Sequence, residues 1–251
     1  MNKIKCTMLL LIAFSTILNA YTFGPSVVTL SSSGNSSSFL YTISNPENRP
    51  IPIDISILKL SKDIDGNPVQ GEEVHDEFVI YPAQFILRKN EERSIQVRYV
   101  GKQDIEIEKT YMILCKEVEL PKKKKEDTGF SASVNVLMNY AGRIYVKPKK
   151  AEANIVIESI GAPLNDKGQQ ELEIVCINNG NLHGKLTNAS FYIRQGARKE
   201  DSGNLKPLIL TMNEVPAMAS SILANSKRRF SILWPEQIPL GQINVELIKG
   251  Y

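Results

Sequence analysis

Histidine and cysteine, which commonly perform catalysis or hold metals, are sparse and far apart in this chain, with two histidines and three cysteines. The histidines are His75 and His183, and neither has a cysteine or a second histidine at the spacing that zinc or haem ligands need. Serine and aspartate are present, but no G-x-S-x-G elbow exists to expose a nucleophile. We therefore expect no catalytic residue, no metal and no cofactor, and we do not expect an enzyme.

The composition is that of a folded protein without a nucleic-acid-binding character. Of 251 residues, 42% are hydrophobic and 23% are charged, which is too apolar for a disordered chain. The formal net charge is only +3, and binding to nucleic acid or to an anionic membrane requires a concentrated basic patch. We expect neither as a partner.

The N-terminus has the pattern of a secretory signal peptide over residues 1–20. Lys3 and Lys5 precede an apolar run from Met8 to Leu18, and the small residue Ala20 stands before the expected cleavage point. The run is shorter than the roughly 20 apolar residues of a membrane-spanning helix, and the alternative is a buried N-terminal helix. Cleavage would remove both lysines and leave 28 basic residues against 27 acidic ones, so the secreted protein would be nearly neutral.

Cleavage would also remove Cys6 and leave Cys115 and Cys176. These two could pair in an oxidising compartment, but the division of the chain into modules places them in different ones. We expect two free, buried thiols that behave as small apolar side chains.

Alternation of apolar and polar residues dominates the rest of the chain and predicts an all-β protein. The clearest strand is Ile51–Ile57, in which isoleucines occupy one face and Pro, Asp and Ser the other. The other predicted strands are 39–44, 78–81, 94–100, 111–118, 133–146, 155–160, 171–178, 190–194, 208–211, 229–234 and 242–248. The charged loop Pro121–Gly129, which contains Lys122–Lys125, has no core-forming residue, so we expect it to be mobile.

Strands of this length and spacing are typical of antiparallel sandwiches, and about 100 residues per immunoglobulin-like module gives two modules. Lys147–Lys150 has the composition of a linker. We therefore predict an N-terminal domain over residues 21–148 and a C-terminal domain over residues 149–251.

Several segments together resemble the PapD-like periplasmic pilus chaperones, in the form found in divergent or archaic chaperone–usher systems. Their order and spacing carry the resemblance, which spans nearly the whole secreted chain. The segments are Thr42–Pro46, Phe78–Pro82, Asn90–Arg98, Tyr111–Glu117, Arg143–Pro148, Cys176–Asn181 and Lys227–Phe230.

The resemblance implies a boomerang of two immunoglobulin-like domains that acts in the periplasm without ATP or a cofactor. Such a chaperone binds and caps pilus subunits that lack their final strand, and delivers them to an outer-membrane usher. It lends a strand of its own to the subunit, a form of β-augmentation.

The resemblance places the donated strand in front of residue 140. Val134, Val136 and Met138 share one face and match the alternating donor positions, and Phe130 and Ala132 extend that face. The alternative is that these side chains pack inside the first sandwich. The neighbouring charged loop favours the edge of the module over its middle, which supports the donor interpretation.

Arg143 matches the position of a basic residue that anchors the terminal carboxylate of the subunit between the two domains. The family has lysine there, and a guanidinium also suits a carboxylate because it can donate two charge-assisted hydrogen bonds. The second anchoring position falls on Thr29, and no Lys or Arg occurs between Lys5 and Arg49. Either Thr29 donates a weaker hydrogen bond, or a residue of the second module takes its place.

Two other hypotheses follow from the same pattern. The chain could be a secreted immunoglobulin-like surface adhesin or a structural pilus subunit, although the stretch before Leu30 is short for a donor extension. A free apolar donor edge could also be capped by a second copy of the chain, giving a dimer.

Overall fold

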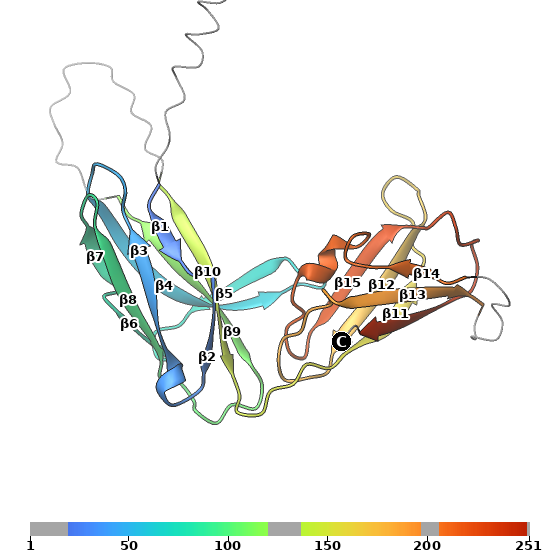
Figure 1. Cartoon of the computed structure of the whole chain (residues 1–251), viewed down its shortest axis with the longest axis horizontal. Coiled ribbons are helices and arrows are strands. Elements are labelled where there is room, and N and C mark those ends of the chain that lie inside the picture. The colour runs from blue at the N-terminus through green and yellow to red at the C-terminus, as the bar shows by residue number, and fades with distance from the viewer. Residues whose placement is uncertain (1–19, 120–136, 197–205, 250–251) are drawn as a thin grey trace, which may run out of the picture.

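The computed structural model describes residues 20–119, 137–196 and 206–249, and these form two β-sandwiches that meet end to end at an angle (Figure 1). The predicted all-β class with two sandwich domains is confirmed. No strand of one sandwich pairs with a strand of the other among the described residues, and no described strand lies between Lys147 and Ile155. The exact domain bounds and the signal peptide, whose residues 1–19 lie outside the described ranges, stay predictions.

The N-terminal sandwich has two sheets. The strands of the first, in spatial order, are β1 (Thr22–Gly24), β3 (Ser38–Ser44), β8 (Glu92–Tyr99) and β6 (Phe78–Tyr81). Those of the second are β2 (Val27–Ser31), β10 (Asn139–Lys147), β9 (Lys109–Glu117), β4 (Ile51–Lys62) and β5 (Pro68–Glu73), and β7 (Gln84–Leu87) also pairs with β4. A short 3-10 turn, η1 (Asn35–Ser37), connects β2 to β3.

The C-terminal sandwich has two three-stranded sheets. The strands of the first sheet, in spatial order, are β11 (Ile155–Gly161), β12 (Glu171–Asn178) and β15 (Lys227–Leu233). Those of the second are β14 (Leu208–Leu210), β13 (Ala189–Gln195) and β16 (Ile243–Lys249). A 3-10 turn, η3 (Pro216–Ala219), precedes β15. In the described parts of the chain, no helix is long and apolar enough to cross a membrane.

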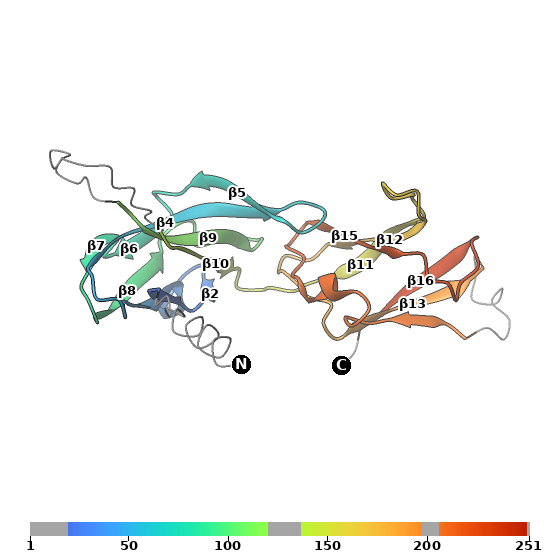
Figure 2. The same ribbon diagram turned by 90° about the horizontal axis from the view of Figure 1, so that it is seen from above.

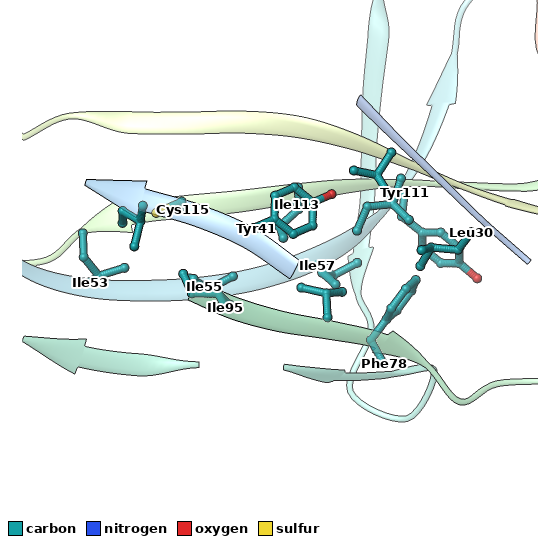
Figure 3. Close-up of a cluster of buried hydrophobic side chains, with 14 of the residues drawn as sticks. Leu30, Tyr41, Ile53, Ile55, Ile57, Phe78, Ile95, Tyr111, Ile113 and Cys115 are labelled. Carbon is teal, nitrogen blue, oxygen red and sulfur yellow. The ribbon is translucent and has the colours of Figure 1, made fainter. Parts of the chain in front are cut away.

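The alternating isoleucines of β4 build the core of the N-terminal sandwich, as their period of two predicts (Figure 3). Ile53, Ile55 and Ile57 are at most 4% exposed and face Tyr41 and Ile95 of the opposite sheet. Burying each such side chain stabilises the fold by about 1.5–3 kcal/mol. The alternation therefore fixes which face of β4 points outward, and that outward face leads to the junction between the domains.

Cys115 and Cys176, the cysteines within the described ranges, are free and buried, one in each core, as predicted. Burial raises the pKa of the Cys115 thiol to about 12 and has the same effect on Cys176. A thiol with such a pKa forms very little nucleophilic thiolate at neutral pH. Neither cysteine is therefore suited to chemistry in the folded protein.

The structure corrects several strand bounds. Strand β4 continues to Lys62, five residues beyond the predicted end. Of the predicted strand 133–146, residues 137 onward are described, and strand β10 begins at Asn139. Strands β1, β2, β5 and β7 were not predicted. All six residues of β5 are exposed, so it has no alternating pattern to detect.

Candidate strand-donor edge and interdomain junction

The first half of β10 lies at an open edge of its sheet. Strand β10 pairs with β9 from Asn139 to Val146, but it pairs with β2 only from Arg143 onward. The Arg143 N–H points to the β2 side and donates to the Ser26 carbonyl at 2.8 Å. Because backbone groups alternate in direction along a strand, Asn139 and Ala141 point to that same side. No strand in the described residues pairs with them there.

The side chains of the even-numbered residues at the start of β10 and just before it face the protein's own core. Met138 and Tyr140 are partly buried and pack against the N-terminal core. The Met138 carbonyl accepts hydrogen bonds from the Glu117 N–H at 3.1 Å and from the Tyr21 hydroxyl at 3.0 Å. Leu137, whose side chain points the other way, is 41% exposed. The edge thus has an apolar side toward the sandwich and a free backbone side.

Of the predicted donor residues, only Met138 lies in the described part of the chain. Phe130, Ala132, Val134 and Val136 lie outside it. The contact of Met138 with the N-terminal core agrees with the alternative in which this face packs on its own sandwich. That contact does not test whether the same face inserts into a partner, so the donor role stays a prediction.

The two predicted anchor positions share the outer face of the second sheet. Arg143 and Thr29 are both exposed, and they lie on adjacent, parallel strands, with Thr29 opposite Tyr145 in register. Tyr145 is 3% exposed, and its hydroxyl lies 3.3 Å from Ser221 Oγ in the C-terminal domain. This face therefore meets the second domain, which is where the sequence predicts the anchor.

Three further cations lie at this junction, and none of them was predicted. They are Lys62 at the end of β4, Lys185 in the loop after β12, and Arg228 on β15. Together with Arg143 we call them the junction cations. Within the described ranges, none of these four makes an ion pair with a carboxylate.

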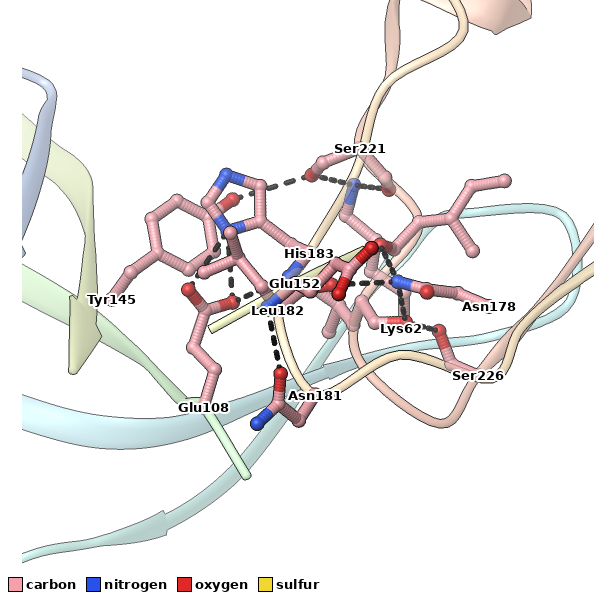
Figure 4. Close-up of polar contacts among 12 residues, drawn as sticks. Lys62, Glu108, Tyr145, Glu152, Asn178, Asn181, Leu182, His183, Ser221 and Ser226 are labelled. Atoms are coloured by element: carbon pink, nitrogen blue, oxygen red, sulfur yellow. Dashed lines mark hydrogen bonds and ion pairs between the residues drawn. The ribbon is translucent and has the colours of Figure 1, made fainter. Parts of the chain in front are cut away.

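Lys62 lies at the centre of the junction, between the domains (Figure 4). Its Nζ donates to Ser220 Oγ at 3.0 Å, to the Ser221 carbonyl at 2.7 Å and to Ser221 Oγ at 3.0 Å. Burial, together with repulsion from Arg143, Arg228 and Lys185, lowers the pKa of Lys62 to about 8. The neutral serine oxygens orient this ammonium group without neutralising its charge.

Arg228 is 9% exposed, and its Nε and Nη1 atoms are buried without a hydrogen-bond partner. Burial lowers the pKa of Arg228, while Asp65 and Asp63 raise it by attraction. The guanidinium lies against Gly66, where an added Cβ would be 1.4 Å from Nη1. Gly66 has φ +76°, which favours glycine, and a side chain at this position would force the Arg228 guanidinium to move.

The β4–β5 hairpin fixes the junction by reaching the C-terminal domain (Figure 2). Arg229 Nε donates to Asp65 Oδ1 at 2.8 Å, and Nη2 donates to Oδ2 at 2.9 Å, which is a bidentate pair. The Arg229 N–H also donates to the Ile64 carbonyl at 2.7 Å. The hairpin therefore holds Lys62 and Arg228 in place.

His183 has a role in the interface between the domains. Its Nδ1 lies 2.8 and 2.9 Å from the two carboxylate oxygens of Glu108, whose side chain is fully buried. Its ring stacks on Tyr145 with centroids 4.0 Å apart. Asn181 supports the same contact, because its carbonyl accepts from the Glu108 N–H at 2.9 Å. These contacts hold the loops of the two domains together (Figure 4).

The arrangement of sheets is the fold of the fimbrial chaperones, which solved structures share with this chain over about nine-tenths of its length. The crystal structure of the class 5 fimbriae chaperone CfaA matches with a TM-score of 0.57 at 16% identity, covering 92% of this chain and 100% of that one. A chain of the Salmonella enterica SafA pilin–SafB chaperone complex matches with a TM-score of 0.52 at 14% identity, covering 94% of each chain.

A third structure is the CsuC–CsuE chaperone–tip adhesin pre-assembly complex from archaic chaperone–usher Csu pili of Acinetobacter baumannii. A chain of it matches with a TM-score of 0.51 at 17% identity, covering 92% of this chain and 98% of that one. A scan of family models and a search of curated proteins find no match to the chain.

Proposed function

We propose that this protein is a periplasmic chaperone that caps pilus subunits by lending them the strand that leads into β10, and delivers them to an outer-membrane usher. The observation that carries the proposal is the open edge of β10, which presents the backbone groups of Asn139 and Ala141 next to an apolar face. A subunit that lacks a strand exposes complementary unpaired backbone groups and an apolar groove.

The energetics suit a transient complex. Each large apolar side chain moved from water into the subunit groove contributes about 1.5–3 kcal/mol, and the costs of association offset part of that gain. Val134, Val136 and Met138 would supply this contribution, with Phe130 and Ala132 extending it. Such a complex is stable enough to prevent aggregation and still allows transfer of the subunit.

The junction between the domains would supply the group that binds the terminal carboxylate of the subunit. Arg143 is exposed on the same strand as the open edge and has no carboxylate partner in the described chain. A subunit strand that pairs along β10 would run toward this guanidinium. We assign Arg143 as the anchor for the terminal carboxylate of the subunit, with Thr29 beside it on β2 as a neutral hydrogen-bonding group.

Co-expression with a pilus subunit from the same locus tests the proposal, and we expect a one-to-one complex. Val136→Glu is expected to lower the yield of that complex at least tenfold, because it would place a charge in an apolar groove. Leu137→Glu is the matched control, since the neighbouring residue has the opposite parity and is expected to retain most of the complex.

Complex yield is measured by affinity purification of the chaperone from periplasmic extract, followed by size-exclusion chromatography. Equal yields from the two variants would contradict the donor face. Recovery of the protein on the cell surface, with no subunit bound, would favour the adhesin hypothesis instead. A dimer of the free chain would identify self-capping by a second copy.

A further inference from the structure

The junction cations form an unneutralised positive site, and Lys62 lies at its centre. Its three hydrogen bonds go only to the neutral oxygens of Ser220 and Ser221. No acidic side chain in the described ranges forms an ion pair with Lys62 or Arg143. A half-buried ammonium group that lacks a counter-ion is stabilised by an anion supplied from outside.

Arg228 gives a second, independent observation of the same kind. Its guanidinium is nine-tenths buried, and two of its nitrogen atoms have no hydrogen-bond partner. The nearest acidic groups, Asp63 and Asp65, act on Arg228 only at longer range, since Asp65 is already paired with Arg229. The junction therefore carries a net positive charge that its own residues leave uncompensated.

The strand geometry places Lys62 on the same face as Arg143. In register across the sheet, Arg143 lies opposite Met112, and Met112 lies opposite Leu58 on β4. Leu58 and Leu60 pack with Met112 on the outer face, and Lys62 follows at the next position of the same parity. The two cations thus border one apolar patch on that face.

We propose that Lys62 is a second carboxylate-binding residue of the junction and acts together with Arg143 on the same anionic group. It takes the place of the second cation that the N-terminal strand lacks, where the chain has Thr29. The identity of the anion, the terminal carboxylate of a bound polypeptide strand, rests on the proposed function. The assignment of Lys62 itself rests on the geometry and charge of the junction.

The charged groups that act on Lys62 are Arg143 on β10, Arg228 on β15 and Lys185 in the loop after β12. Tyr145 on β10 meets the same serine as Lys62, since its hydroxyl lies 3.3 Å from Ser221 Oγ, and Asp63 follows Lys62 directly in the chain. The repulsive neighbours and burial lower the pKa of Lys62 to about 8 in the free protein. A carboxylate at Lys62 would favour its charged form and raise that pKa again.

Binding should therefore take up a proton and weaken as the pH rises. With a free-state pKa of about 8, Lys62 is mostly charged at pH 7 and mostly neutral at pH 9. If binding requires the charged form, affinity falls about tenfold between these two pH values. Arginine at this position would stay charged throughout that range.

The test uses the purified secreted protein and a rhodamine-labelled, N-acetylated peptide that spans the C-terminal strand of the co-expressed subunit. The peptide is prepared with a free terminal carboxylate and with a terminal amide, and binding is followed by fluorescence polarisation at pH 7 and pH 9. We expect the carboxylate peptide to bind about tenfold more weakly at pH 9. The amide peptide is expected to show little pH dependence.

Two variants and a control complete the experiment. Lys62→Arg should keep the preference for the carboxylate and lose the pH dependence, whereas Lys62→Met should lose both the pH dependence and most of the preference. Lys59→Met, an exposed lysine of the same strand, should behave like the unmodified protein.

Equal affinity at both pH values, or an undiminished carboxylate preference in Lys62→Met, would overturn the role of Lys62. The proposed function would survive that result if the carboxylate preference still depended on Arg143. Absence of any subunit complex would instead contradict the proposed function, and the inference with it.

Discussion

Arg143→Ala is expected to weaken subunit binding by about 2–4 kcal/mol, which corresponds to about 30- to 1,000-fold in affinity. The reason is that the variant leaves the subunit carboxylate beside the apolar outer face of the sheet without its guanidinium partner. Arg143 is exposed and has no ion-pair partner in the described chain, so its removal should not unfold the protein. The measurement is the yield and dissociation rate of the co-expressed complex.

Arg98→Ala is the matched control for Arg143→Ala. Arg98 is also an exposed strand arginine, but it lies on β8 in the other sheet of the N-terminal sandwich. We expect this control to bind the subunit as the unmodified protein does. If both variants retained the complex equally, Arg143 would have no anchoring role.

Gly66→Ala is expected to disturb the junction between the domains and to lower the free energy of unfolding by about 2–4 kcal/mol. An added Cβ would lie 1.4 Å from Arg228 Nη1, so the buried guanidinium would have to leave its position. The φ of +76° adds the cost of the left-handed region, about 1–2 kcal/mol for a residue with a side chain. Displacement of the hairpin would also strain the Asp65–Arg229 pair.

Gly168→Ala is the control that separates the cost of the backbone angle from the cost of the contact with Arg228. Gly168 has φ +73°, nearly the same as Gly66, but no atom lies within 4 Å of its added Cβ. This variant should lose only the backbone contribution and keep the arrangement of the domains. Denaturant unfolding and small-angle X-ray scattering of both variants make the comparison. Equal destabilisation with unchanged scattering would show that the contact between Gly66 and Arg228 does not support the junction.

The sequence predicts the fold well where side chains alternate between core and solvent. The isoleucines of β4 are an example, because each of Ile51, Ile53, Ile55 and Ile57 is almost fully buried and the residues between them are not isoleucines. Strand β5 has no such pattern because all six of its residues are exposed, and β1 has only three residues. Backbone pairing forms these strands, and pairing leaves little trace in residue type.

The candidate site is only partly visible in the sequence. Alternation identifies the face of Met138, but packing on the protein's own core and insertion into a partner require the same apolar pattern. The sequence could not place Lys62 and Arg228 at one site, because they lie on elements that are far apart in the chain. The β4–β5 hairpin and β15 are joined by the Asp65–Arg229 pair, whose two residues are 164 positions apart. The position of Thr29 signalled that a cation was missing, but not which residue replaces it.

Amide hydrogen exchange measured by NMR tests most directly whether a subunit strand pairs with the open edge of β10. The N–H groups of Asn139 and Ala141 point to the unpaired side and should exchange quickly in the free protein. The N–H of Tyr140 points toward β9 and serves as an internal control, protected in both states. In the one-to-one complex we expect at least tenfold slower exchange at Asn139 and Ala141. Unchanged exchange at both amides in a stable complex would contradict strand donation by β10.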